Sequence, residues 1–252
     1  SNETSAELAS VLSELSPGDL NTVFFTPDGS SANETALRFV MLYNNLLGRP
    51  EKKHIISRDR AYHGSTYLTA SITGKDREEN NFDFEKNFIH HLGSPNPYRR
   101  NENQTVEDFC DEKVKEFENK ILEIGSDKVA AYIAEPVLAS GGCIVPPKNY
   151  IKRFWDVCKK YDVLYISDEV VTAFGRLGHF FCSQDEFDII PDIITTAKGI
   201  TSGYIPLGAV LISDKLIAQI SKDSSMLFHG FTYSGHPVSC AAALKNIEIM
   251  KR

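Results

Sequence analysis

Short apolar runs alternate along this chain with longer stretches that are apolar on one side only. A short run bounded by polar residues, Gly or Pro is typical of a buried strand, whereas helical spacing of apolar residues is typical of a surface helix. Strands that alternate with helices predict an α/β fold, with a mainly parallel sheet flanked by helices on both faces. The six predicted strands are centred on Ile55, Ile89, Tyr132, Tyr165, Ile194 and Val210.

Amphipathic helices are predicted between several of these strands. In the stretch from 150 to 161, Ile151, Phe154, Trp155 and Cys158 share one helical face. The chain contains no internal repeat and no linker rich in Gly, Ser or Pro, so we expect a single domain. The segment 76–100 is polar around one apolar run and is expected to lie on the surface. The predicted helices span residues 32–47, 106–124, 150–161 and 238–250.

Charge and patterning exclude several classes of protein. The 252 residues carry a formal net charge of −7, which argues against a nucleic-acid or anionic-membrane partner because both are polyanions. No uncharged apolar run is long enough to span a bilayer, and the start of the chain lacks the parts of a signal peptide, so a cytoplasmic location is expected. The cysteines occur singly and the histidines lack ligand spacing, so no metal site is expected.

The stretch FFTPDGSSANETALRF, residues 24–39, passes from a strand or turn through small residues into a helix. Asp28 and the serines can cap that helix by accepting backbone N–H bonds. Alternatively, Gly29 and Ser30 leave N–H groups free to hold an anion at the positive end of the helix. The stretch alone favours capping, but it leaves both interpretations open.

Chemically active residues follow three of the predicted strands. In a parallel sheet, ligands bind outside the carboxyl ends of the strands, and here those positions hold Glu135, Asp168 and Lys198. Asp168 can cap or salt-bridge a loop, or it can hold a cation. Lys198 can be a solvated surface lysine, or a shielded amine that forms a Schiff base with a carbonyl.

One molecule matches an anion site, an acidic residue and a lysine amine together. Pyridoxal 5′-phosphate has a phosphate, a ring nitrogen that accepts a proton, and an aldehyde. Gly29 with Ser30 suits the phosphate, Asp168 suits the ring nitrogen, and Lys198 suits the aldehyde. The residues therefore predict a binding site for pyridoxal phosphate.

Six ordered motifs resemble those of one enzyme family. They are DGSSANETALR, AYHGST, IAEPVLASGG, YISDEVVTAFGRLG, DIITTAKGITSGYIPLGAVLIS and GFTYSGHPVSCAAAL. Together they resemble the large domain of a class III aminotransferase, a fold-type-I enzyme dependent on pyridoxal phosphate and related to the omega-amino acid:pyruvate transaminases. The resemblance implies that residues 1–252 form the cofactor-binding large domain, without the family's N-terminal segment and C-terminal small domain.

The resemblance also implies roles for individual residues. Lys198 would form the Schiff base and move the proton on the substrate carbon, and Asp168 would hold the pyridinium proton. Asp28 departs from the family pattern, because an acid beside a phosphate repels it unless the side chain turns away to cap the helix. Six further residues would lie around the cofactor: Tyr62 and Val170 on the two ring faces, His63 behind the residues that touch the ring, Glu135 near the ring, and Gly29 and Ser30 at the phosphate.

By the same resemblance, the active site would be shared between two chains of a homodimer. Phe231 and Thr232 would reach the neighbouring site, where the threonine binds the phosphate. From the residues alone, TYSGHP is an ordinary turn before a helix. The implied reaction moves an amino group from an amine or omega-amino acid to a keto acid such as pyruvate.

Three alternatives stay open at this stage. Lys198 and Asp168 would serve a mutase, racemase or decarboxylase on the same scaffold equally well. The chain could also be an incomplete module that binds the cofactor without turnover. A dinucleotide-binding domain is less favoured, because no G-x-G-x-x-G follows an early strand.

Overall fold

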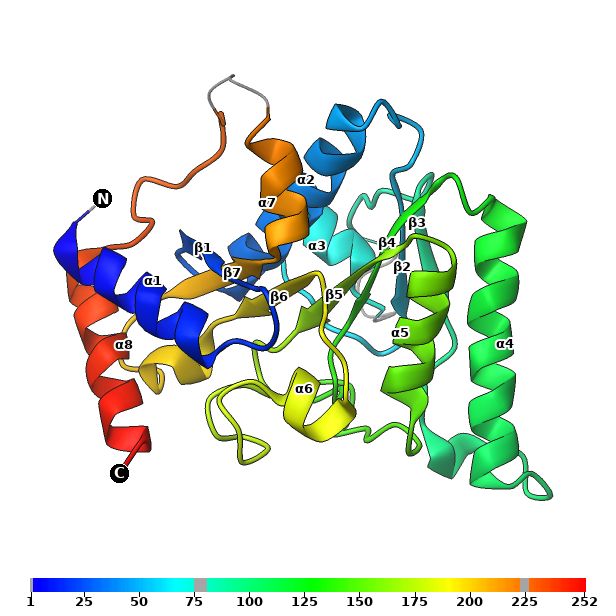
Figure 1. Ribbon diagram of the computed structural model, residues 1–252. Helices are drawn as coiled ribbons and strands as arrows, with labels where there is room; N and C mark the ends of the chain where they lie inside the picture. Colours follow the sequence, from blue (N-terminus) through cyan, green and yellow to red (C-terminus); the bar gives the residue numbers. More distant parts are fainter. Residues whose placement is uncertain (1, 75–80, 223–226) are drawn as a thin grey trace.

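The computed structural model describes residues 2–74, 81–222 and 227–252. Within these ranges, seven strands form one mixed sheet in the order β1-β7-β6-β5-β4-β2-β3 (Figure 1). All six predicted strands are confirmed, and a seventh contains Phe24. The strands are β1 Thr22–Thr26, β2 His54–Arg58, β3 Ile89–Leu92, β4 Val129–Ala134, β5 Leu164–Asp168, β6 Ile193–Thr196 and β7 Gly208–Ile212.

The sheet is mainly parallel, as predicted. Strands β3, β2, β4, β5 and β6 pair in parallel, and only β7 among the described strands runs antiparallel to its neighbours β6 and β1. Because β7 is reversed against both of them, β1 points in the same direction as β6. The carboxyl ends of β1, β4, β5 and β6 therefore lie at one edge of the sheet.

Three of the four predicted helices match closely, and the fourth begins earlier than expected. The helix predicted from residue 32 starts at Gly29, because Asp28 rather than a later serine is its N-cap. Four short or terminal helices, α1, α3, α6 and α7, were not predicted. The helices are α1 Glu3–Leu15, α2 Gly29–Leu46, α3 Tyr67–Ile72, α4 Val106–Ile124, α5 Tyr150–Lys160, α6 Cys182–Phe187, α7 Asp214–Ile220 and α8 Pro237–Met250, with 3₁₀ turns η2 Pro97–Arg99 and η3 Lys198–Thr201.

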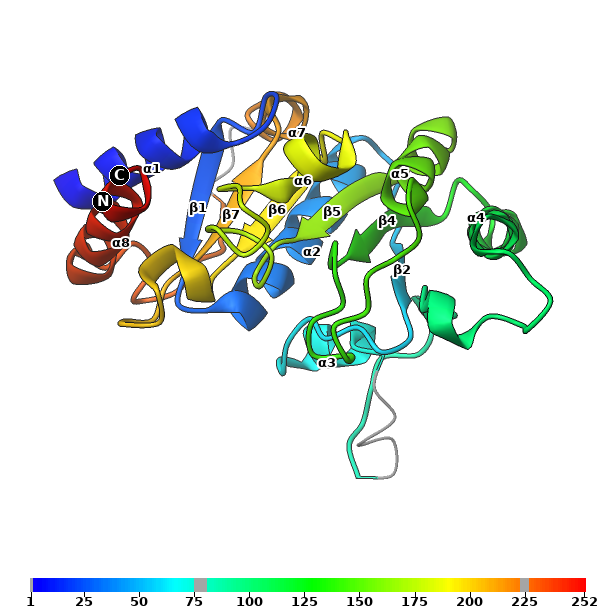
Figure 2. The ribbon, with the colours of Figure 1, turned by 90° about the horizontal axis from the view of Figure 1, so that it is seen from below.

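The core lies in layers on the two faces of the sheet. Alternate residues of a strand face opposite sides, so Leu164 and Ile166 of β5 pack in the layer that contains α2, α3 and α7, whereas Tyr165 packs with α4 and α5. At the β1 end, α1 and α8 pack together over β7, and both chain ends lie on that side (Figures 1 and 2). None of the described helices is long and apolar enough to cross a bilayer.

The predicted surface segment 76–100 falls partly outside the described residues. Its apolar run forms the edge strand β3, which pairs in parallel with β2. From residue 93 the chain continues through η2, where Tyr98 is exposed, toward α4. The described part of the segment therefore agrees with a surface position, apart from the paired strand.

Candidate active site

A pocket of about 720 Å³ opens at the carboxyl edge of the parallel strands. Its walls come from the start of α2, the segment after β2, the ends of β4, β5 and β6, and the loop between η3 and β7. Eight of the ten residues predicted to bind a cofactor line this one pocket: Gly29, Ser30, Tyr62, His63, Glu135, Asp168, Val170 and Lys198.

The start of α2 is capped at one N–H group and left open at two others. The Asp28 carboxylate accepts from the Ser31 backbone N–H at 2.8 Å and also from the Ser31 hydroxyl. The N–H groups of Gly29 and Ser30 are at the first two helical positions, where an α-helix provides no acceptor, and they bond no other described residue. The acid thus serves as the cap, while two donors at the positive end of the helix can receive an anion.

Two glycines bring the backbone close to neighbouring groups at this end of the pocket. A Cβ on Gly29 would lie 3.1 Å from both Cγ atoms of Val170. Gly64 has φ of +145°, and a Cβ there would lie 2.5 Å from Thr69 Oγ1 and 2.7 Å from Ser30 Oγ. Only glycine fits these two positions without displacing a neighbour.

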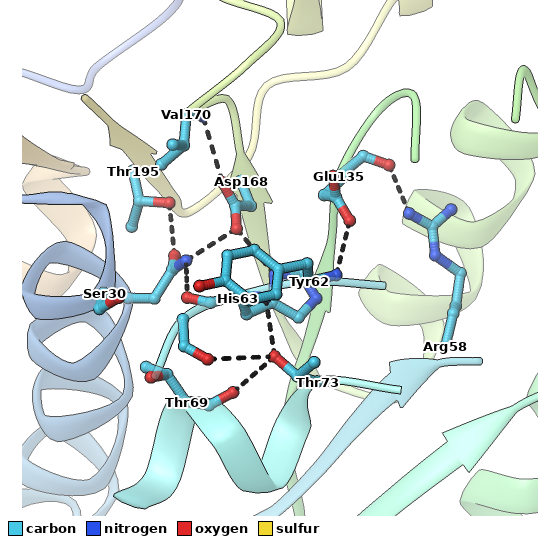
Figure 3. Close-up of polar contacts among 12 residues, drawn as sticks. Ser30, Arg58, Tyr62, His63, Thr69, Thr73, Glu135, Asp168, Val170 and Thr195 are labelled. Atoms are coloured by element: carbon cyan, nitrogen blue, oxygen red, sulfur yellow. Dashed lines mark hydrogen bonds and ion pairs between the residues drawn. The ribbon is translucent and has the colours of Figure 1, made fainter. Parts of the chain in front are cut away.

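Asp168, the last residue of β5, lies in the pocket wall with its carboxylate held by three donors (Figure 3). Oδ2 accepts from Asn33 Nδ2 and from His63 Nδ1, each at 2.7 Å, and Oδ1 accepts from the Val170 N–H at 3.1 Å. Because the carboxylate accepts from Nδ1, that nitrogen carries the proton in the neutral ring. The carboxylate is thereby fixed in one orientation in the pocket wall, where a cationic ring nitrogen would complement it.

The neighbouring acid, Glu169, has a different role. Its carboxylate is fully buried and accepts from the N–H groups of Cys182 and Ser183, at the start of α6, and from the Ser183 hydroxyl. Burial raises the pKa of Glu169. Capping is thus the task of Glu169, whereas Asp168 faces the pocket.

Asn33 is a site residue that the sequence reasoning missed. It is 1% exposed, donates from Nδ2 to both Asp168 and the His63 carbonyl, and accepts from Thr195 Oγ1 at 2.6 Å. The His63 carbonyl can only accept, so it fixes the amino group on this side of the amide, where that group also donates to the carboxylate of Asp168. The signal was its place within the first helical turns of α2, next to the small residues that were singled out.

Glu135 follows β4 and joins two segments of the pocket wall. Its carboxylate accepts from the Tyr62 N–H at 2.9 Å and from the Ala139 N–H at 3.3 Å. Burial raises the pKa of Glu135, and the nearby Asp168 charge raises it further. The Tyr62 ring is 38% exposed at the pocket, and its hydroxyl pairs with Ser65 Oγ at 3.0 Å.

Lys198 follows β6 and is the only lysine among the residues that line the described pocket. Its φ is +43°, in the left-handed region that a residue with a side chain adopts rarely. Its amine forms no hydrogen bond or ion pair with the described residues. Residues with a strained backbone of this kind are common at functional sites. Here the strained residue is also the one whose amine is exposed at the pocket.

Phe231 and Thr232, the remaining two predicted residues, do not line the pocket. Thr232 is exposed and Phe231 is half-buried. The Phe231 ring meets His229 edge-to-face, and His229 Nε2 pairs with Thr35 Oγ1 of α2 at 2.8 Å. Within the chain, this segment therefore packs near α2, outside the pocket.

The described residues present three complementary groups to one space. Open N–H donors at a helix start suit an anion, a fixed carboxylate suits a cation, and an unpaired amine suits a carbonyl carbon. Pyridoxal phosphate fits this set, and the volume and the glycine-lined approach leave room for it.

Comparison with curated proteins gives one consistent family. A family model described as Aminotransferase class-III matches residues 1–252. The chain is 44% identical over 245 residues to a probable gamma-aminobutyrate transaminase 4 of Oryza sativa subsp. japonica, covering 96% of this chain and 50% of the relative. It is 48% identical over 232 residues to gamma aminobutyrate transaminase 1, mitochondrial, of Solanum lycopersicum, covering 90% and 45%. The chain spans about half the length of these relatives.

Solved structures agree in fold. An (S)-enantioselective omega-transaminase from Thermomicrobium roseum superposes with a TM-score of 0.97 at 43% identity, covering 100% of this chain and 56% of that one. The omega transaminase from Pseudomonas jessenii, solved in complex with PMP, superposes with a TM-score of 0.96 at 43% identity and the same coverage. The described fold is therefore the α/β fold of fold type I that the sequence predicted.

Proposed function

The chain belongs to the class-III aminotransferase family, and from this membership and the pocket we propose that it binds pyridoxal 5′-phosphate and transfers an amino group to a keto acid such as pyruvate. The donor would be an amine or an omega-amino acid. The names of the relatives, gamma-aminobutyrate and omega transaminases, support that class of donor.

One observation carries the proposal: Gly29 with Ser30, Asp168 and Lys198 lie around one pocket although they come from distant parts of the sequence. A structural role, such as capping a helix or facing solvent, can explain each of these residues alone. It does not explain why they all lie around one pocket. When bound, pyridoxal phosphate supplies an aldehyde that condenses with amines and a protonated ring that withdraws electrons from the substrate carbon.

At one side of the pocket, the protein binds and orients. The Gly29 and Ser30 N–H groups would hold the phosphate. Asp168, whose carboxylate is oriented by three hydrogen bonds, would hold a proton on the ring nitrogen. A fixed negative charge there stabilises a positive ring without reorganisation as electrons move.

Lys198 would move the proton of the reacting substrate carbon. Its amine has no partner among the described residues, so it would be available as the base that takes a proton from the substrate carbon and as the acid that returns it. Tyr62 and Val170 would cover the ring faces and exclude water from them.

We also propose that the active unit is a homodimer in which Phe231 and Thr232 reach the partner's pocket. Their position outside this chain's own pocket is compatible with that role. Exposed aromatic side chains nearby, Phe228 and Tyr233, support an interface, since they are 87% and 70% exposed in the single chain.

The test is a half-reaction followed by visible absorbance. Protein loaded with pyridoxal phosphate should lose its yellow colour when an amine donor is added and regain it with pyruvate. Binding without turnover would leave the colour unchanged, and a decarboxylase would release carbon dioxide from an amino acid donor. A Lys198→Ala variant of unchanged circular dichroism should stay inert, and a loaded wild type that never bleaches with any amine would contradict the proposed transamination.

A further inference from the structure

Arg58, the last residue of β2, is a completely buried cation without a counter-ion among the described residues. Its Nη2 donates to the main-chain carbonyl of Glu135, while Nε and Nη1 have no partner among the described residues. The ring of Tyr150 lies 6.0 Å from the guanidinium carbon. Three buried tyrosines, Tyr132, Tyr150 and Tyr165, and the Glu135 carboxylate act electrostatically on the guanidinium, but none of them forms an ion pair with it. Burying a cation without an ion pair is costly, so we look for a role of Arg58 beyond filling space.

Glu135 connects Arg58 with the pocket. Arg58 holds the carbonyl of Glu135, and the carboxylate of the same residue accepts the Tyr62 N–H at 2.9 Å (Figure 3). The segment 58–62 is therefore fastened at both ends to one residue. Burial raises the pKa of Glu135, and the positive charge of Arg58 opposes that increase, which favours the carboxylate as an acceptor.

From Tyr62 the contacts continue to the anion-binding turn. The Tyr62 hydroxyl pairs with Ser65 Oγ at 3.0 Å, and the Ser65 N–H donates to Ser30 Oγ at 3.2 Å. A displacement of Tyr62 would thus alter both the cover of the ring and the support of the phosphate end. Arg58 does not line the pocket, so any effect on the cofactor must pass through these residues.

We propose that Arg58 is a positioning residue for the cofactor: by fixing the main chain of Glu135 and supplying a buried positive charge, it sets the place of Tyr62 over the ring. This inference rests on the proposed binding of pyridoxal phosphate. It assigns Arg58 no contact with the cofactor or the substrate.

The experiment measures the dissociation constant of pyridoxal phosphate by absorbance titration in purified wild type, Arg58→Met and Arg58→Lys. Lys52→Met is the matched control, because Lys52 is 4% exposed and donates to the Ser126 carbonyl at 2.9 Å, outside the pocket. Each variant is repeated in a Glu135→Ala background, and thermal unfolding and the visible circular dichroism of the bound cofactor are recorded for all.

We expect Arg58→Met to weaken cofactor binding at least about tenfold, the change that corresponds to one charged hydrogen bond, and to reduce the visible circular dichroism at saturation. Arg58→Lys, which keeps the charge, should restore much of the affinity, and Lys52→Met should lower the melting temperature without changing the dissociation constant. In the Glu135→Ala background, the Arg58 substitutions should cause no further loss of cofactor affinity.

The proposal is overturned if Arg58→Met lowers only the melting temperature, or if the Arg58 effects are unchanged in Glu135→Ala. If Arg58→Met does not fold, Arg58→Lys is compared in the wild-type and Glu135→Ala backgrounds instead. An equal loss of cofactor affinity in both backgrounds contradicts the proposal. A wild type that binds no pyridoxal phosphate refutes the proposed function itself, and this inference with it.

Discussion

Replacing Asn33 by alanine tests whether the hydrogen-bond network behind Asp168 organises the pocket. The change removes one bond to a carboxylate, worth about 1.5–3 kcal/mol, and leaves the Thr195 hydroxyl and one carbonyl buried without a partner, at about 1–3 kcal/mol each. If water enters the space and satisfies one of these groups, we expect a loss of about 2.5–6 kcal/mol in the free energy of unfolding. A loss of that size is smaller than the free energy of unfolding of many domains, so the variant can remain folded.

Asn44→Ala is the matched control for this prediction. Asn44 lies on the same helix, is 1% exposed, and donates to the Val40 carbonyl at 3.0 Å, but it does not line the pocket. We expect it to lose only about 1 kcal/mol, the value of one neutral hydrogen bond.

The assay is urea unfolding without cofactor, followed by titration with pyridoxal phosphate. Asn33→Ala should weaken cofactor binding about tenfold, because Asp168 loses one of its three donors, and Asn44→Ala should leave it unchanged. Equal stabilities for the two variants, with unchanged cofactor affinity in both, would refute the account of the network.

Three further predictions concern the phosphate end and the sheet edge. Gly64→Ala should lower both the free energy of unfolding and the affinity for phosphate, because the added Cβ would lie closer than 3 Å to two hydroxyl oxygens. Gly142→Ala is the control, since Gly142 also has a positive φ but no atom lies within 4 Å of an added Cβ. In the same unfolding assay it should show the backbone strain alone, about 1–3 kcal/mol. Asp28→Asn should keep the helix cap and bind inorganic phosphate more tightly than wild type, since it removes one negative charge; weaker binding in a phosphate competition titration would contradict this reasoning. His54 and His90 pair at 2.8 Å and burial lowers the pKa of both, so the unfolded state binds protons first and the free energy of unfolding should decrease as the pH falls below about 6.5. His54→Gln should flatten that decrease in denaturant titrations between pH 7.5 and pH 5, and an unaltered slope would exclude this pair as its source.

Much of the fold was predictable because the buried strands are nearly continuous apolar runs. The helix α4, Val106–Ile124, was predicted to the residue from the helical spacing of its apolar residues. The structure shows Thr105 as its N-cap and Gly125 as its C-cap. The reversed direction of β7 was not predictable, because strand direction depends on the connection and not on the composition of the strand. The helices α3, α6 and α7 were missed because six or seven residues show too little periodicity.

Within the site, the residues that follow strand ends were predictable, and the residues that only contact those residues were not. Asp168 and Lys198 follow apolar runs directly, and the sheet brings them to one pocket. Asn33 and Arg58 are ordinary members of a helix and a strand in the sequence, and only their long-range hydrogen bonds, to Asp168 and to Glu135, connect them with the site. Such contacts become visible only when the tertiary structure is known.

The central claim is that Lys198 carries the cofactor in the pocket at the end of β6. The most direct measurement is borohydride reduction of the protein with pyridoxal phosphate, which makes the bond between lysine and cofactor permanent, followed by peptide mass spectrometry. We expect stoichiometric labelling of Lys198 at low cofactor concentration and no labelling of the other lysines. Labelling spread over exposed lysines, or retained at full extent in Lys198→Ala, would contradict it.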